Sequence, residues 1–148
     1  MQIALRPALP EDRTFARALY FETMRWIIEH LFGWDEAREE RNFANFYDAG
    51  GVRIITADGV EVGWMQELTD EATIFLGSLY VKPEMQRRGI GSEILRGLLE
   101  RGRLERKSVT LAVVKINPAV RLYERHGFRQ THEDLHKVYL RADPADGG

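Results

Sequence analysis

Residues 86–92 read Gln86-Arg87-Arg88-Gly89-Ile90-Gly91-Ser92 and separate two segments of different periodicity. The preceding segment, residues 73–81, is rich in the β-branched and aromatic residues that favour a half-buried strand. In the following segment, apolar residues recur at helical spacing, at Ile90, Ile94, Leu95, Leu98 and Leu99. The first N–H groups of a helix lack intrahelical acceptors, and glycines let a phosphate approach them closely. The stretch therefore predicts a polyphosphate-binding loop, with Arg87 and Arg88 supplying charge-assisted contacts.

Two common glycine-rich signatures do not fit this loop. A Walker A loop requires a lysine directly after its last glycine, where this chain has Ser92. A dinucleotide fingerprint requires a third glycine at the position of Ile94. The pattern Gln/Arg-x-x-Gly-x-Gly/Ala fits at every fixed position, although a glycine-opened helix with exposed arginines would give the same six residues.

A second pattern begins about 25 residues further on and reads Asn117-Pro118-Ala119-Val120-Arg121-Leu122-Tyr123-Glu124-Arg125-His126-Gly127-Phe128. Asn117 is a favoured N-cap, Pro118 suits a first helical position and Gly127 suits a left-handed C-terminal cap, so a short helix is predicted. In their order and spacing, the two patterns resemble the signature of the GNAT superfamily of acetyl-CoA-dependent N-acetyltransferases.

The resemblance implies a mixed α/β (α+β) fold with a mainly antiparallel central sheet, splayed near its middle and flanked by helices. The residue patterns agree with the order of elements in that fold. Strands are expected at 2–6, 52–56, 60–68, 73–81, 108–114, 128–131 and 137–140, and helices at 10–32, 34–47, from 89 and from 117. Asp58-Gly59 is a strong hairpin signal. We expect one domain over residues 1–141 and a frayed tail over 142–148.

In the GNAT family the pantetheine arm of acetyl-CoA pairs like an extra strand with the strand before the phosphate loop. The resemblance assigns these contacts to Leu79, Tyr80 and Val81, with the Leu79 N–H polarising the thioester carbonyl. The other implied cofactor-binding residues are Gln86, Arg87, Arg88, Gly89, Ile90, Gly91, Ser92 and Asn117. Asn117 could equally be a helix cap alone. Gly77 falls where the family has a bulge, and simple close packing would also explain a glycine there.

The resemblance assigns general acid catalysis to Tyr123. A free thiol has a pKa of about 8.5 and a tyrosine about 10, so a neutral tyrosine can protonate a departing thiolate at neutral pH. The alternative is a core tyrosine. No general base is assigned, because Glu22 and Glu67 are more readily explained as solvated surface acids. His30 and His126 are likewise more often packed or surface residues than catalytic ones.

The first two helices cover the acceptor side of the cleft in this family. Nine of the fifteen aromatic residues of this chain lie in residues 15–47. We favour a core role for most of them, in a stripe that includes Phe15, Leu19, Trp26, Ile27 and Leu31. Phe21, Trp26, His30 and Trp34 are kept as candidate substrate-binding residues for an apolar or cationic amine.

Composition excludes several classes. The 148 residues carry a net charge of −2, which implies no general attraction to nucleic acid or anionic membrane. The absence of cysteine excludes disulfides, thiolate metal sites and an acyl-cysteine intermediate, and no metal site is expected. The chain has no signal-peptide pattern or membrane-length apolar stretch, so a cytoplasmic location is expected. Many members of the family form dimers, so a homodimer is among the expectations.

The predicted function is acetyl transfer from acetyl-CoA to a primary amine by direct attack in a ternary complex. The acceptor, a small molecule or a peptide, is not identified by the sequence. The alternative from another class is a CoA-binding regulatory module that retains the donor site without catalysis.

Overall fold

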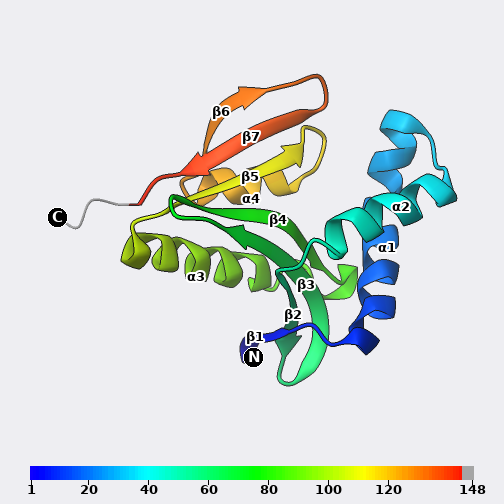
Figure 1. Cartoon of the computed structure of the whole chain (residues 1–148), viewed down its shortest axis with the longest axis horizontal. Helices are drawn as coiled ribbons and strands as arrows, with labels where there is room; N and C mark the ends of the chain where they lie inside the picture. The colour runs from blue at the N-terminus through cyan, green and yellow to red at the C-terminus, as the bar shows by residue number, and fades with distance from the viewer. Residues whose placement is uncertain (145–148) are drawn as a thin grey trace. The chain divides into compact units, whose positions relative to one another are not determined.

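The computed structural model describes residues 1–144, and its elements follow the expected order (Figure 1). The strands are β1 (Ile3–Pro7), β2 (Val52–Ala57), β3 (Val60–Thr69), β4 (Thr73–Val81), β5 (Ser108–Val114), β6 (Arg129–Glu133) and β7 (Lys137–Ala142). The helices are α1 (Arg13–Phe32), α2 (Glu36–Tyr47), α3 (Ile90–Glu105) and α4 (Ala119–Arg125), with 3₁₀ turns at Pro10–Asp12 and Pro83–Met85. The hydrogen-bonded strand order is β1-β2-β3-β4-β5-β7-β6. The mixed fold with its mainly antiparallel sheet is therefore confirmed.

The chain divides into two compact units. Unit 1 comprises Met1–Gln66 and Ser78–Arg88, and unit 2 comprises Glu67–Gly77 and the described residues from Gly89 onward. Strands β3 and β4 contribute residues to both units. The expectation of a single domain over residues 1–141 stays a prediction.

The core of unit 1 is built from aromatic side chains of α1, α2, β3 and β4. Trp64 is 1% exposed, and its Nε1–H donates to the carbonyl of Ala16 at 3.1 Å. Its ring centroid lies 6.2 Å from that of Phe43 and 4.9 Å from that of Tyr80. Most of the aromatic residues of the first two helices therefore have the core role that we favoured. Trp26 does not, because it is 51% exposed.

Strand β5 is central to unit 2. It pairs in parallel with β4 from Thr73 to Leu76 and antiparallel with β7. The apolar stripe of α3 is buried as predicted, at Ile90, Ile94, Leu95 and Leu98. The expectation that residue 142 belongs to a frayed tail is wrong, because Ala142 pairs with Val109 as the last residue of β7. Residues 145–148 of the expected tail lie outside the described residues.

The Asp58-Gly59 hairpin joins β2 and β3, as the sequence predicts. Both residues have positive φ angles, 51° and 84°, which is the conformation that a two-residue type I′ turn requires. The antiparallel register places Ile54 opposite Trp64, with an irregularity between Ile55 and Thr56. The hairpin thus fixes which face of β3 carries the buried Trp64.

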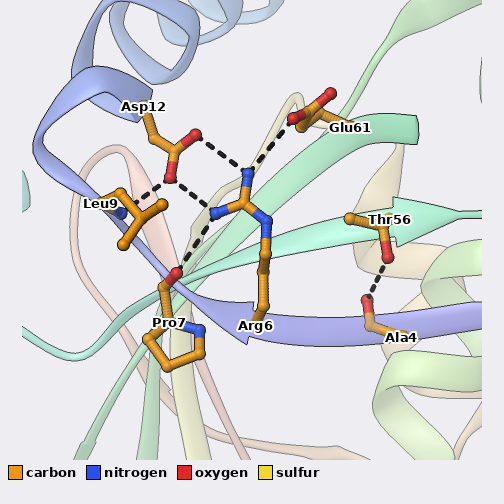
Figure 2. A network of polar contacts seen from close by, with 7 residues as sticks. All are labelled: Ala4, Arg6, Pro7, Leu9, Asp12, Thr56 and Glu61. Atoms are coloured by element: carbon orange, nitrogen blue, oxygen red, sulfur yellow. Dashed lines mark hydrogen bonds and ion pairs between the residues drawn. The ribbon is translucent and has the colours of Figure 1, made fainter. Parts of the chain in front are cut away.

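A polar network joins β1 to the beginning of α1 (Figure 2). The Asp12 carboxylate accepts from Arg6 Nη1–H at 2.7 Å, from Arg6 Nη2–H at 3.0 Å and from the backbone N–H of Leu9 at 2.7 Å. Arg6 also donates to Glu61 on β3 at 3.2 Å. The carboxylate of Asp12 therefore accepts a hydrogen bond from the Leu9 N–H at the start of the helical segment. It also holds the Arg6 side chain of β1 against β3 and the beginning of α1.

We predict that Asp12→Ala lowers the free energy of unfolding by about 1–3 kcal/mol, because it leaves the Leu9 N–H without its acceptor and the Arg6 guanidinium with Glu61 as its remaining carboxylate partner. The hydrogen bonds from Arg6, with smaller contributions from the Leu9 N–H and the charge of Arg6, hold the pKa of the Asp12 carboxyl below its ordinary value of 3.8. Its stabilisation is then complete above about pH 3.8 and is lost as the pH falls through the folded-state pKa.

Urea unfolding of the wild type and Asp12→Asn between pH 7 and pH 2 measures this contribution. The stability difference between them should shrink on acidification below pH 4. A difference that is independent of pH would contradict the assigned role of the carboxylate charge.

Candidate functional site

The loop between β4 and α3 has an unusual backbone. Arg87 and Gly89 both have positive φ angles, 63° and 81°. For a non-glycine residue such as Arg87 this conformation is strained, and strain of this kind concentrates at functional sites. The side-chain amide of Gln86 donates to the carbonyl of Val81 at 3.0 Å, which ties the loop to the end of β4. The loop thus makes two sharp left-handed turns directly before α3.

Helix α3 begins at Ile90, as the sequence predicts. The first bond of its hydrogen-bond ladder runs from the N–H of Glu93 to the carbonyl of Gly89 at 3.0 Å. The N–H groups of Ile90, Gly91 and Ser92 precede that bond, in the position where a helix offers its free donors and positive dipole end to an anion. This local structure suits a pyrophosphate.

Residues 89–92 of the first pattern lie in unit 2 together with the second pattern, and the first turn of α3 packs there against α4. A Cβ atom on Gly91 would lie 3.1 Å from Cδ2 of Leu122, so a glycine permits this close approach. Ser92 Oγ lies 3.0 Å from His126 Nε2 at the end of α4. The hydrogen bond between Ser92 and His126 could not be predicted from the sequence, because the two residues lie in different motifs.

The surroundings of His126 are electropositive. Burial lowers the pKa of the imidazole, and the charges of Arg96 and Arg125 lower it further. The imidazole is therefore held neutral at physiological pH beside two guanidinium groups. A positive field of this kind at the start of α3 favours a polyphosphate ligand.

Helix α4 presents the second pattern. The Asn117 side-chain oxygen accepts from the N–H of Ala119 at 2.9 Å, so the cap role is present although the helix begins at Ala119. Tyr123 is 7% exposed, and its ring centroid lies 5.9 Å from that of Phe128. Gly127 has a φ angle of 90° and ends the helix in the predicted left-handed conformation. The contacts of Asn117 and Tyr123 with a ligand stay predictions.

Strand β4 directs alternate backbone N–H groups to opposite edges. The N–H of Lys82, directly after the strand, donates to the carbonyl of Val62 on β3 at 2.8 Å. The alternation therefore directs the N–H groups of Leu79 and Val81 to the edge that faces away from β3. The pairing of β4 with β5 ends at Leu76. Leu79 and Val81 thus lie on a stretch of strand edge that suits an additional extended chain.

Glu67 is not the solvated acid that the sequence suggested. It is 7% exposed, and its carboxylate accepts from Arg101 Nη1–H at 2.9 Å and Nη2–H at 2.8 Å. This bidentate pair engages both carboxylate oxygens of Glu67 and gives the side chain a structural role between β3 and α3. Glu22, the other candidate base, is exposed on α1 as expected.

The structure divides the four candidate substrate-binding residues into two pairs. Phe21 and Trp34 are in edge-to-face contact, with ring centroids 5.3 Å apart. The guanidinium carbon Cζ of Arg25 lies over the Trp34 ring, 4.7 Å from its centroid. Trp26 and His30 are both exposed on α1. An aromatic contact therefore exists at Phe21 and Trp34, and its role toward a substrate stays a prediction.

Residues 1–144 contain neither a candidate metal site nor a membrane-spanning helix. Within this range, no cluster of three or more His, Cys, Asp or Glu side chains could hold a metal ion. Nor does this part of the chain contain a helix long and apolar enough to cross a membrane.

The family model for the acetyltransferase (GNAT) domain matches residues 48–130, more than half of the chain. The chain belongs to the GNAT acetyltransferase family. This confirms the family that the two motifs indicated, and acyl transfer from acetyl-CoA is the chemistry of that family. The match spans β4, the glycine loop and α4, which carry the residues discussed above.

One curated relative is the mycothiol acetyltransferase of Acidimicrobium ferrooxidans, which is 33% identical over 121 residues. The match covers 77% of this chain but only 37% of the relative, so this GNAT chain spans little more than a third of the length of that protein.

Solved structures with the same fold include the PaiA N-acetyltransferase of Thermoplasma acidophilum in complex with coenzyme A. It is 20% identical with a TM-score of 0.73, over 97% of this chain and 99% of that chain. A protein of Arabidopsis thaliana in complex with the bisubstrate analogue CoA-Ac-MVNAL is 17% identical with a TM-score of 0.69, over 97% and 99% of the two chains. At these identities the likeness shows the GNAT fold.

We predict that Glu67→Gln lowers the free energy of unfolding by about 1–3 kcal/mol, because an amide cannot accept both guanidinium donors. In an assay of acetyl transfer, the same variant should keep the shape of the wild-type pH profile of kcat, since Glu67 is not the base. If Glu67→Gln lost the high-pH plateau of kcat while its free energy of unfolding stayed at the wild-type value, the structural role of Glu67 would be contradicted. Glu22→Gln is the matched control on an exposed acid.

Proposed function

We propose that this chain is an N-acetyltransferase that moves the acetyl group of acetyl-CoA to a primary amine by direct attack in a ternary complex. The observation that carries the proposal is the packing of the first turn of α3 against α4 through Gly91–Leu122 and Ser92–His126. This packing joins residues 89–92, the part of the candidate phosphate loop that begins α3, to the helix of Tyr123 within unit 2. Membership of the GNAT family supports the same reaction class.

The donor would lie along β4 and end at the loop. The first N–H groups of α3 and the side chains of Arg87 and Arg88 would bind the pyrophosphate. The N–H groups of Leu79 and Val81 would pair with the pantetheine arm, because the strand alternation directs them away from β3. Asn117, at the entry to α4, would contact the same arm while it caps the helix. The remaining loop residues Gln86, Gly89 and Ile90 shape the backbone around the phosphates.

The chemistry requires an oxyanion donor and an acid. As the neutral amine attacks the thioester carbon, the Leu79 N–H stabilises the negative charge that develops on the carbonyl oxygen. When the carbon–sulfur bond breaks, the Tyr123 hydroxyl donates its proton to the departing sulfur. The amine loses its own proton to water, since we assign no protein base. Tyr123 recovers a proton from solvent after product release.

The acceptor is proposed only as a class. The Arabidopsis thaliana structure holds a bisubstrate analogue that contains the sequence MVNAL. Similarity to it, and to the PaiA N-acetyltransferase, supports an amine acceptor that is a peptide or a small molecule. Phe21 and Trp34 are the residues we propose for contact with it, with Trp26 and His30 on the exposed face of α1. A homodimer and a cytoplasmic location remain predictions.

A non-catalytic CoA-binding module is the competing proposal. It would retain the loop and the β4 edge but would not use Tyr123. Release of free thiol from acetyl-CoA separates the two, provided that each amine of a panel of peptides, amino acids and polyamines is compared with a control without amine. Amine-dependent thiol release supports the enzyme. Binding of acetyl-CoA without thiol release across the panel supports the module.

We predict that Tyr123→Phe lowers kcat roughly 10²- to 10⁴-fold with little change in acetyl-CoA affinity, because it removes the proton of the leaving group and keeps the ring. Steady-state kinetics on the best amine, with a binding titration of acetyl-CoA, measures both quantities. Tyr139→Phe is a control on an exposed hydroxyl, whose partner is Asp134 at 2.8 Å. Full activity of Tyr123→Phe at every pH would refute the acid role.

A further inference from the structure

Gly63 on β3 stands directly against the end of β4. A Cβ atom on this glycine would lie 2.2 Å from the carbonyl oxygen of Tyr80, 3.2 Å from its carbonyl carbon and 3.2 Å from the Cα of Val81. All three are backbone atoms, so rotation of a side chain cannot relieve the overlap. Any other residue at position 63 must displace the backbone of β4 or of β3.

The contact also indicates how the Tyr80–Val81 peptide is oriented. In a regular sheet the ladder carbonyls lie within the sheet, whereas Cβ atoms stand off its faces. The Tyr80 oxygen occupies the space that a Cβ on Gly63 would need, so this carbonyl approaches β3 more closely than a residue with a side chain at position 63 would allow. Because the peptide is planar and trans, the N–H of Val81 points the opposite way, toward the edge of β4 that faces away from β3.

The surroundings keep β4 from relaxing away from this position. The Tyr80 ring packs in the core of unit 1, with its centroid 4.9 Å from Trp64 and 5.9 Å from Tyr20. One residue after Val81, the N–H of Lys82 is bonded to Val62, the neighbour of Gly63. The Tyr80–Val81 peptide is therefore held on both sides, and an added Cβ at position 63 must move either this peptide or the backbone of β3.

We infer that Gly63 is a positioning residue, whose missing side chain lets the Tyr80 carbonyl approach β3 and so directs the Val81 N–H at the extended arm of the acyl donor. The inference rests on the proposed function, since it requires acetyl-CoA to lie along β4. It adds a residue of β3, a strand with no assigned part in the site, to the determinants of donor binding.

Gly63→Ala tests the inference against two ligands. Acetyl-CoA contains the arm, whereas 3′-phospho-ADP is the nucleotide end alone and requires only the loop and α3. Loss of one hydrogen bond to the arm should weaken acetyl-CoA about tenfold and leave the affinity for 3′-phospho-ADP unchanged. Gly97→Ala is the matched control, because a Cβ there meets no atom within 4 Å, and neither affinity should change.

Equal affinity of Gly63→Ala and the wild type for acetyl-CoA would overturn the inference, and so would an equal loss for both ligands, which indicates general damage. A wild type that binds 3′-phospho-ADP but not acetyl-CoA would refute the proposed donor path, and the inference with it. If Gly63→Ala does not fold, amide hydrogen exchange of the wild type decides. Acetyl-CoA must then slow exchange at Val81 while 3′-phospho-ADP does not, and equal exchange with both ligands would overturn the inference.

Discussion

The proposed donor site depends on the direction of a few backbone N–H groups more than on any side chain. Strand alternation, set by the bond from Lys82 to Val62, directs the N–H groups of Leu79 and Val81 away from β3. The beginning of α3 at Ile90 leaves three more N–H groups ahead of its ladder. Backbone donors cost nothing in side-chain entropy to hold, and their directions change only when the fold changes. Rigid elements around them are therefore part of the site.

The buried carboxylates serve that rigidity. Asp12, Glu39 and Glu67 are each less than 9% exposed, and each is paired with an arginine, namely Arg6, Arg38 and Arg101. Glu39 also accepts from the hydroxyl of Tyr20 at 3.1 Å. A carboxylate with such partners has its oxygens engaged by fixed donors and holds its arginine in place. Removal of the amine proton by water, rather than by a buried acid, is consistent with these pairings.

Sequence reasoning predicted the family, the order of elements and the local caps because these depend on short-range rules. Gly89 of the loop, the Asp58-Gly59 turn and the Gly127 cap each require a backbone conformation that few residues adopt. Contacts between distant segments could not be predicted in this way. The Ser92–His126 bond, the Glu67–Arg101 pair and the approach of Gly63 to Tyr80 join residues whose neighbourhood only the fold creates. Trp26, which we place in the core stripe and also keep as a candidate substrate-binding residue, is 51% exposed, because helical spacing defines a stripe but not its edges.

Tyr80 shows how the core and the donor strand constrain each other. Burial raises the pKa of its hydroxyl to about 12, so the ring is neutral at physiological pH and offers no base. The same ring packs on Trp64, while the backbone of Tyr80 presses against Gly63, next to Trp64 in β3. A change in the packing of Trp64 must therefore reach the peptide that carries the Val81 N–H. If the donor lies along β4 as proposed, the aromatic residues that pack on Trp64 and Tyr80 affect its binding without touching it.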